Sequence, residues 1–197
     1  MPRLALCAAI FGFIITGCSQ GPDRYAAKDI VKIIDFELSP DEGKIAFSAI
    51  TPVGNLDIWV VDISGKNLKK LTFQDHSPTN RIAGFFKKRR WRNFFEIDMR
   101  YPEWTEDGRV AFCQELSKTD TWSVHTASRR YWTINPNGAD KKPLTESDKI
   151  LKRKHPAPVN KFKFSGRSEK YNLSVLLKND ALWILKDGTA SPQKLIQ

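Results

Sequence analysis

The side chains of this 197-residue sequence that could do covalent chemistry include three cysteines, Cys7, Cys18 and Cys113. A thiol can act as a nucleophile, carry a covalent modification or bind a metal ion. Cys18 has the most distinctive context, because an apolar run ends in Ile-Thr-Gly (residues 15–17) directly before it. Small residues at the end of such a run are typical of a processing site. Cys18 is therefore the first candidate for a modified residue.

Segment 1–17 has the three parts of a secretory signal, with a positive charge at Arg3, an apolar core and small residues before the cut. The apolar core has about a dozen residues, whereas roughly 20 are needed to cross a bilayer as a helix. Residues 15–18 resemble the lipobox of bacterial lipoproteins, in which the cysteine is diacylated before cleavage. The resemblance implies a signal peptide over 1–17 and membrane anchoring through lipid on Cys18. The alternative is an ordinary signal peptide in which Cys18 is incidental.

Ser19 follows Cys18, where lipoproteins retained in the inner membrane commonly carry aspartate. In a Gram-negative host this favours the outer membrane, with the protein facing the periplasm. Residues 18–29 are small, polar and charged, and we expect them to form a tether between the lipid and one folded domain at 30–197. The formal net charge of +10 favours anionic partners in general but names none.

From residue 30 onward, short runs of β-branched and aromatic residues alternate with Asp-Gly, Asn-Gly and Ser-Gly turns. This pattern predicts an all-β fold. It recurs over about 30–73, 100–146 and 160–197. In each copy a tryptophan precedes a leucine by the same 12 residues, and the pairs are Trp59 and Leu71, Trp132 and Leu144, and Trp183 and Leu195. Self-similarity of this kind is typical of repeat architectures.

The motifs of the first two copies, Ser-Pro-Asp-Glu-Gly-Lys-Ile-Ala-Phe at 39–47 and Thr-Glu-Asp-Gly-Arg-Val-Ala-Phe at 105–112, resemble the TolB-type, WD-like β-propeller repeat. The resemblance implies antiparallel blades, with tryptophans between neighbouring sheets. It also implies an interaction module for a protein, peptidoglycan-associated or glycan partner. Glu42 is inserted in the first turn, and the third copy lacks the Pro-Asp-Gly turn. We expect the acidic residues at the repeat turns to form local hydrogen bonds and not to act as acids or bases, and they are Asp41, Asp57, Asp62, Asp107 and Asp187.

Three blades do not close a ring by themselves, because propellers typically have four to eight. Weaker strands within 74–100 and 113–130 could add to a sheet, two chains could pair into a six-bladed ring, or the chain could be an open fragment. An incomplete ring leaves strand edges that invite pairing with another chain. A homo-oligomer and a partner-completed sheet are therefore both open alternatives.

Five cations lie among aromatic residues between the first and second copies, and they are Lys87, Lys88, Arg89, Arg90 and Arg92. We expect this basic cluster to meet lipid headgroups, lipopolysaccharide phosphates or other envelope anions, at about 1 kcal/mol per residue near a charged membrane. The same composition suits single-stranded nucleic acid, but export disfavours that partner. The competing interpretation is a solvated turn whose aromatic residues belong to strands or core.

No catalytic residue, metal site or cofactor is predicted. His76, His125 and His155 have no carboxylate or cysteine at metal-ligand spacing, and nucleophile-elbow, zinc-protease and phosphate-loop motifs are missing from the sequence. Cys113 follows Val-Ala-Phe in a strand-like run and is expected to be a buried thiol. The sequence thus predicts a non-catalytic, lipid-anchored envelope protein. The alternative is a ligand-binding or accessory subunit of an envelope enzyme or transport system.

Overall fold

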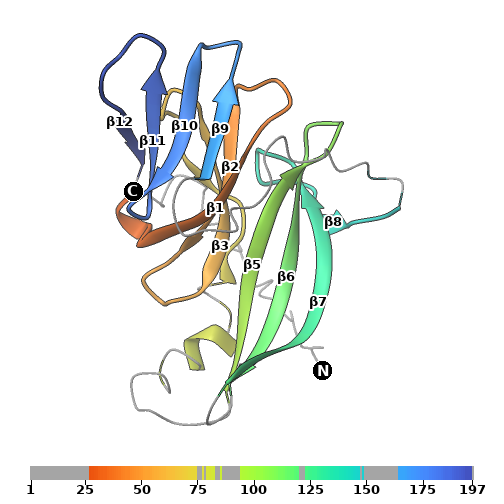
Figure 1. Cartoon of the computed structure of the whole chain (residues 1–197). Helices are drawn as coiled ribbons and strands as arrows, with labels where there is room; N and C mark the ends of the chain where they lie inside the picture. Colours follow the sequence, from red (N-terminus) through yellow and green to blue (C-terminus); the bar gives the residue numbers. More distant parts are fainter. Residues whose placement is uncertain are drawn as a thin grey trace, which may run out of the picture.

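The computed structural model describes residues 27–74, 77, 79–82, 85, 94–119, 123–146, 148 and 164–196. These residues form an all-β structure of three antiparallel four-stranded sheets (Figure 1). A short 3-10 helix, Ala27–Asp29, precedes the first strand. The predicted fold class of antiparallel β sheets is thus confirmed. Within the described ranges, no helix is long and apolar enough to cross a membrane.

Each sheet is a meander in which the strands pair in chain order. Sheet 1 contains β1 (Lys32–Leu38), β2 (Lys44–Ile50), β3 (Leu56–Asp62) and β4 (Lys69–Lys70). Sheet 2 contains β5 (Phe94–Trp104), β6 (Val110–Thr119), β7 (Val124–Ile134) and β8 (Lys142–Pro143). Sheet 3 contains β9 (Phe164–Ser168), β10 (Leu173–Lys178), β11 (Ala181–Lys186) and β12 (Gln193–Ile196).

The turn between β1 and β2 is held by its own polar side chains. Ser39 Oγ donates to the Asp41 carboxylate at 2.5 Å and accepts from the backbone N–H of Lys44 at 2.8 Å. The inserted Glu42 takes a positive φ of 60° there. In sheet 2, Thr105 Oγ1 donates to the Asp107 carboxylate at 2.5 Å. Asp41 and Asp107 therefore form local hydrogen bonds, as expected. For Asp57 the expectation is wrong, because it lies within β3 and bonds Thr72 and Gln74, 15 and 17 residues further along the chain.

The three sheets share one register around their tryptophans. In β3, β7 and β11 the tryptophan pairs with the residue directly before the leucine that follows it by 12 positions. The pairs are Trp59 with Lys70, Trp132 with Pro143, and Trp183 with Lys194. On the other side, the same tryptophans face Phe47, Phe112 and Leu176. The equal tryptophan-to-leucine spacing is therefore the register of an antiparallel strand pair, repeated in all three sheets.

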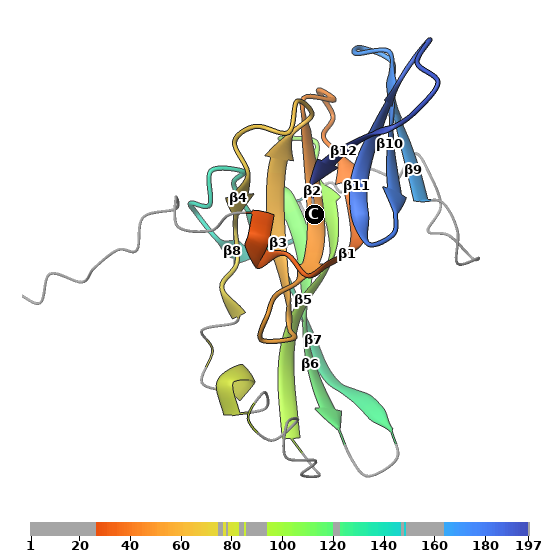
Figure 2. The same ribbon diagram turned by 90° about the vertical axis from the view of Figure 1, so that its left-hand side faces the viewer.

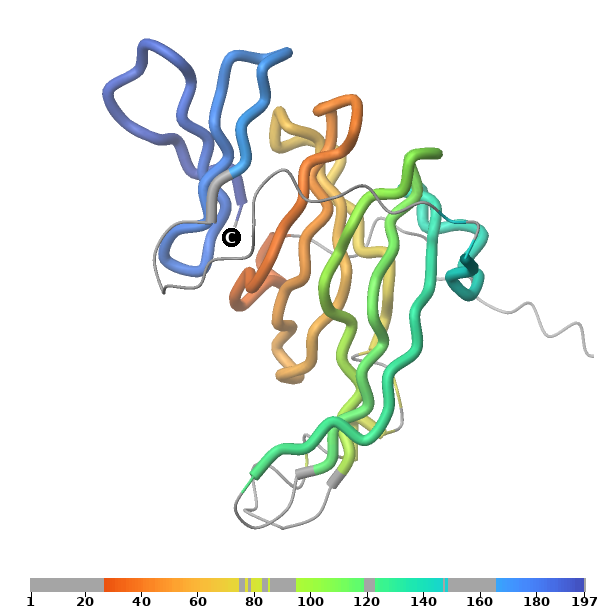
Figure 3. Tube along the Cα trace, turned by 45° about the vertical axis from the view of Figure 1, so that its right-hand side comes forward, coloured from red at the N-terminus to blue at the C-terminus, as the bar shows by residue number. Residues whose placement is uncertain are grey.

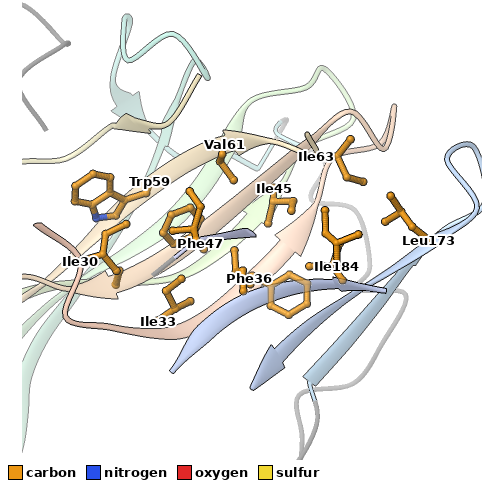
Figure 4. Close-up of a cluster of buried hydrophobic side chains, with 14 residues drawn as sticks. Ile30, Ile33, Phe36, Ile45, Phe47, Trp59, Val61, Ile63, Leu173 and Ile184 are labelled. Atoms are coloured by element: carbon orange, nitrogen blue, oxygen red, sulfur yellow. The ribbon is translucent and has the colours of Figure 1, made fainter. Parts of the chain in front are cut away.

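Sheet 1 lies between the other two (Figures 1 and 3). One of its faces packs on sheet 3, where Phe47 and Trp59 share a core with Ile184 (Figure 4). Its other face packs on sheet 2, where Ile58 shares a core with Phe112. The spatial order is sheet 3, sheet 1, sheet 2, so the described sheets form an open row and not a closed ring.

Sheet 2 is longer than the others because residues 94–99, 114–119 and 124–130 extend its first three strands into an arm (Figure 2). One of the three alternatives for completing a ring is that weaker strands within 74–100 and 113–130 add to a sheet. Where they are described, these strands lengthen sheet 2 and do not form a further sheet. The β5–β6 register shifts between Arg100 and Glu103, where the arm begins. The β6–β7 register shifts between Leu116 and Ser117, within the arm.

Candidate interaction surfaces

The predicted site residues fall outside the described part of the chain. This holds for the lipidation candidate Cys18 and for the basic cluster of Lys87, Lys88, Arg89, Arg90 and Arg92. His76 and His155 also lie outside it, while His125 is exposed and shares a 2.6 Å hydrogen bond with Ser123. The structure therefore leaves the anchor and the basic cluster as predictions.

Cys113 lies in β6 and is 1 % exposed. Burial raises the pKa of its thiol, and the negative charge of Glu115 adds to this effect. A thiol with a raised pKa is a poor nucleophile near neutral pH. The expectation of a buried thiol is confirmed.

A buried ion pair joins β3 to β4 in sheet 1. Lys70 Nζ lies 3.1 Å from Asp57 Oδ2, and the two side chains are 1 % and 0 % exposed. Asp57 also accepts hydrogen bonds from Thr72 Oγ1 at 2.7 Å, the Gln74 backbone N–H at 2.8 Å and Asn55 Nδ2 at 3.2 Å. Burial raises the pKa of Asp57, opposed by Lys70 and these hydrogen bonds. Because both groups are buried, the pair ties the edge strand β4 to β3.

The arm of sheet 2 carries ion pairs, and one of their carboxylates, Asp98, also accepts a hydrogen bond from the Leu56 backbone N–H of sheet 1 at 2.8 Å. Arg100 lies 2.7 Å from Asp98, and Arg129 lies 3.3 Å from Glu115. Burial alone would raise the pKa of Glu115, but the hydrogen bond from Thr126 and the nearby arginines outweigh it and lower the pKa. Glu115 is therefore a stably charged partner, and its arrangement suits holding strands together rather than proton transfer.

The face of sheet 2 that carries the paired residues Cys113 and Tyr131 holds a cavity of about 390 Å³. It is lined by Ala111 and Cys113, which are buried, and by Tyr131 and Leu144. Tyr131 is 54 % exposed. Tyr101 also lines the cavity and takes a φ of 56° at the irregularity in β5, a conformation that costs a non-glycine residue about 1–3 kcal/mol. The cavity was not predicted, although its Leu144 belongs to the repeat.

The outer edge of β7 is a second exposed feature. The first eight residues of β7 are exposed, and β8 pairs only with Trp132 and Thr133. Among the described residues, no strand pairs with the outer edge of 124–130. An open strand edge of this length presents backbone donors and acceptors to which another extended chain can pair.

Comparison with known proteins assigns no family. No family model and no curated protein matches the sequence. One solved structure that is similar is described as "putative TolB from Agrobacterium tumefaciens", with 11% identity and a TM-score of 0.25. The match covers 82% of this chain and 64% of that one, so the chain spans less than two thirds of its length. This likeness is too weak to support the arrangement of the sheets, and the resemblance to TolB-type repeats remains a prediction.

Proposed function

We propose that the chain is a lipid-anchored protein of the bacterial cell envelope that binds a protein or glycan partner and catalyses no reaction. The observation that carries the binding role is the open edge of β7 over Val124–Arg130. Exposed edge strands are a common site for pairing with an extended segment of another protein. A protein partner at this edge is the form of binding that the geometry supports best.

The edge is tested by replacing Val124, which is 66 % exposed, with a photoreactive amino acid in the full chain. Irradiation of cells is expected to give one discrete cross-linked product. Val53 is 39 % exposed in the β2–β3 turn and provides the control position. If Val124 gives no product, or only the products that Val53 gives, the edge is not a binding site.

The anchor rests on residues 15–18 and on the short apolar core before them. Cys18→Ser in the full chain is expected to abolish lipid labelling and processing, since the thiol that accepts the lipid is gone. Cys7→Ser is the matched control, because Cys7 would leave with the signal peptide. Membrane fractionation and labelling with a fatty-acid analogue measure both outcomes. A Cys18→Ser chain that is still processed and membrane-bound would contradict the proposal.

The basic cluster is proposed to add electrostatic attraction to an anionic surface. Replacing Lys87, Lys88, Arg89, Arg90 and Arg92 with glutamine should weaken binding to vesicles that contain anionic lipid, and more so at low salt. Lys178 and Lys186, which are exposed on sheet 3, provide a control pair for the loss of charge. Equal binding by the cluster variant and the unchanged chain at low salt would exclude the contact.

A further inference from the structure

Each sheet has two chemically different faces. One face carries the tryptophan and its partner on the second strand, which are Trp59 with Phe47, Trp132 with Phe112, and Trp183 with Leu176. We call this the tryptophan face. The opposite face carries the residues on either side of the tryptophan in sequence, because side chains alternate along a strand. We call it the receiving face.

The contact between sheets is the same in both places where it occurs. Trp59 of sheet 1 belongs to the same core cluster as Leu182 and Ile184, which lie on the receiving face of sheet 3. Trp132 of sheet 2 packs against the cluster that holds Ile58 and Val60 of the receiving face of sheet 1. Each contact therefore sets a tryptophan face against a receiving face.

One face of each kind is left without such a contact among the described sheets. The tryptophan face of sheet 3 is apolar at its centre, where Leu176, Trp183 and Leu185 are each partly exposed. The receiving face of sheet 2 carries the exposed Tyr131. Because sheet 1 lies between sheets 2 and 3, these two faces are at opposite ends of the row (Figure 3).

The cavity lies at the repeat position where a tryptophan face is received. In sheet 1, Ala46, Ile58 and Leu71 belong to the cluster against which Trp132 packs. Their counterparts in sheet 2 by strand register and by the tryptophan-to-leucine spacing are Ala111, Tyr131 and Leu144. All three line the cavity of about 390 Å³. The space that an aromatic side chain fills on sheet 1 is thus still open on sheet 2.

We propose that a second copy of the chain fills this space, with Trp183 of each copy entering the cavity beside Tyr131 of the other. The described residues of two copies supply six sheets, which is within the four to eight of closed propellers. The two contacts are identical and are related by a two-fold axis, so each unpaired face is covered once and the assembly closes. This inference concerns assembly and holds whether or not the chain is lipid-anchored.

The contact can be tested by cross-linking in the full chain. Tyr131→Cys and Lys178→Cys, in a Cys113→Ser background, place one thiol at the cavity and one on the tryptophan face of sheet 3 while leaving Trp183 in place. A short bismaleimide is expected to give a product of two chains. The matched control combines Tyr131→Cys with Val53→Cys, and it should give at least tenfold less of this product.

Two further variants attack the contact from its two sides. Trp183→Ser removes the side chain that enters the cavity. Ala111→Phe places a larger side chain at a residue that lines the cavity, so that it occupies part of that space. Each is expected to reduce the two-chain product at least tenfold, whereas Val53→Ser should leave it unchanged. The proposal is overturned by the absence of a two-chain product, by a product that neither variant reduces, or by a ladder of longer products that signals an open filament.

Discussion

Removing the negative charge of Asp57 is expected to destabilise the protein strongly. Asp57→Asn keeps the shape of the side chain and leaves the ammonium group of Lys70, which is 1 % exposed, without its counter-charge. Breaking a buried ion pair in this way typically costs about 3–5 kcal/mol. For a chain of 150–250 residues, about 2–4 °C of Tm is lost per kcal/mol. The variant should therefore melt roughly 6–20 °C below the unchanged chain.

Lys70→Met should cost less than Asp57→Asn. Asp57 keeps its hydrogen bonds from Thr72, Gln74 and Asn55, and burial has already raised its pKa, so the carboxyl can become neutral by taking up a proton. Thermal unfolding followed by circular dichroism, at one protein concentration and neutral pH, gives both values.

The double variant Asp57→Asn with Lys70→Met decides whether the charge itself is responsible. It should be more stable than Asp57→Asn alone, because no unpaired charge remains buried. If Asp57→Asn costs less than about 1 kcal/mol, or if the two single effects simply add, the pair does not act as argued.

Two further predictions concern the rest of the described fold. The pKa of Glu115 is lowered in the folded state, so its contribution to stability is present above its ordinary pKa of 4.5 and is lost as the pH falls through the lowered pKa. Glu115→Gln should therefore reduce the loss of unfolding free energy at acid pH, measured by denaturant titration at a series of pH values. The same loss in the variant and in the unchanged chain would contradict the ion-pair assignment. A Cβ at Gly166 would lie 3.0 Å from Leu38 Cδ1 and 3.3 Å from Phe36 Cε2, so Gly166→Ala should cost about 1–3 kcal/mol through crowding between sheets 1 and 3. Ser174→Ala on the opposite face of sheet 3 is the control, and equal melting of the two variants would contradict that contact.

The repeat could be predicted from the sequence because strand register is a local property. The interval from Trp59 to Leu71 is set by one turn and one strand pair, and it recurs wherever the same turn and pair recur. The hydrogen bonds of the β1–β2 turn could also be predicted, because Asp41 accepts from Ser39 and from the Gly43 backbone N–H, each two residues away. Local patterns therefore gave the β fold and the internal order of each sheet.

The order of the sheets could not be predicted in the same way. Packing of sheet 3 on sheet 1 depends on Ile184 joining the core cluster that holds Phe36 of sheet 1 (Figure 4), across more than a hundred residues, and this leaves no periodic signal in the sequence. The burial of Lys70 is similar, because adjacent lysines in sequence normally indicate an exposed edge. Only the structure shows that Asp57 lies beside it.

The central claim is that the row of three sheets is half of an assembly whose unpaired faces match. Native mass spectrometry of the full chain, extracted from membranes in mild detergent, tests it most directly. Two copies per particle are expected for the unchanged chain, and one copy for Trp183→Ser. A single copy per particle for the unchanged chain at micromolar concentration, or an open series of larger particles, would contradict the claim.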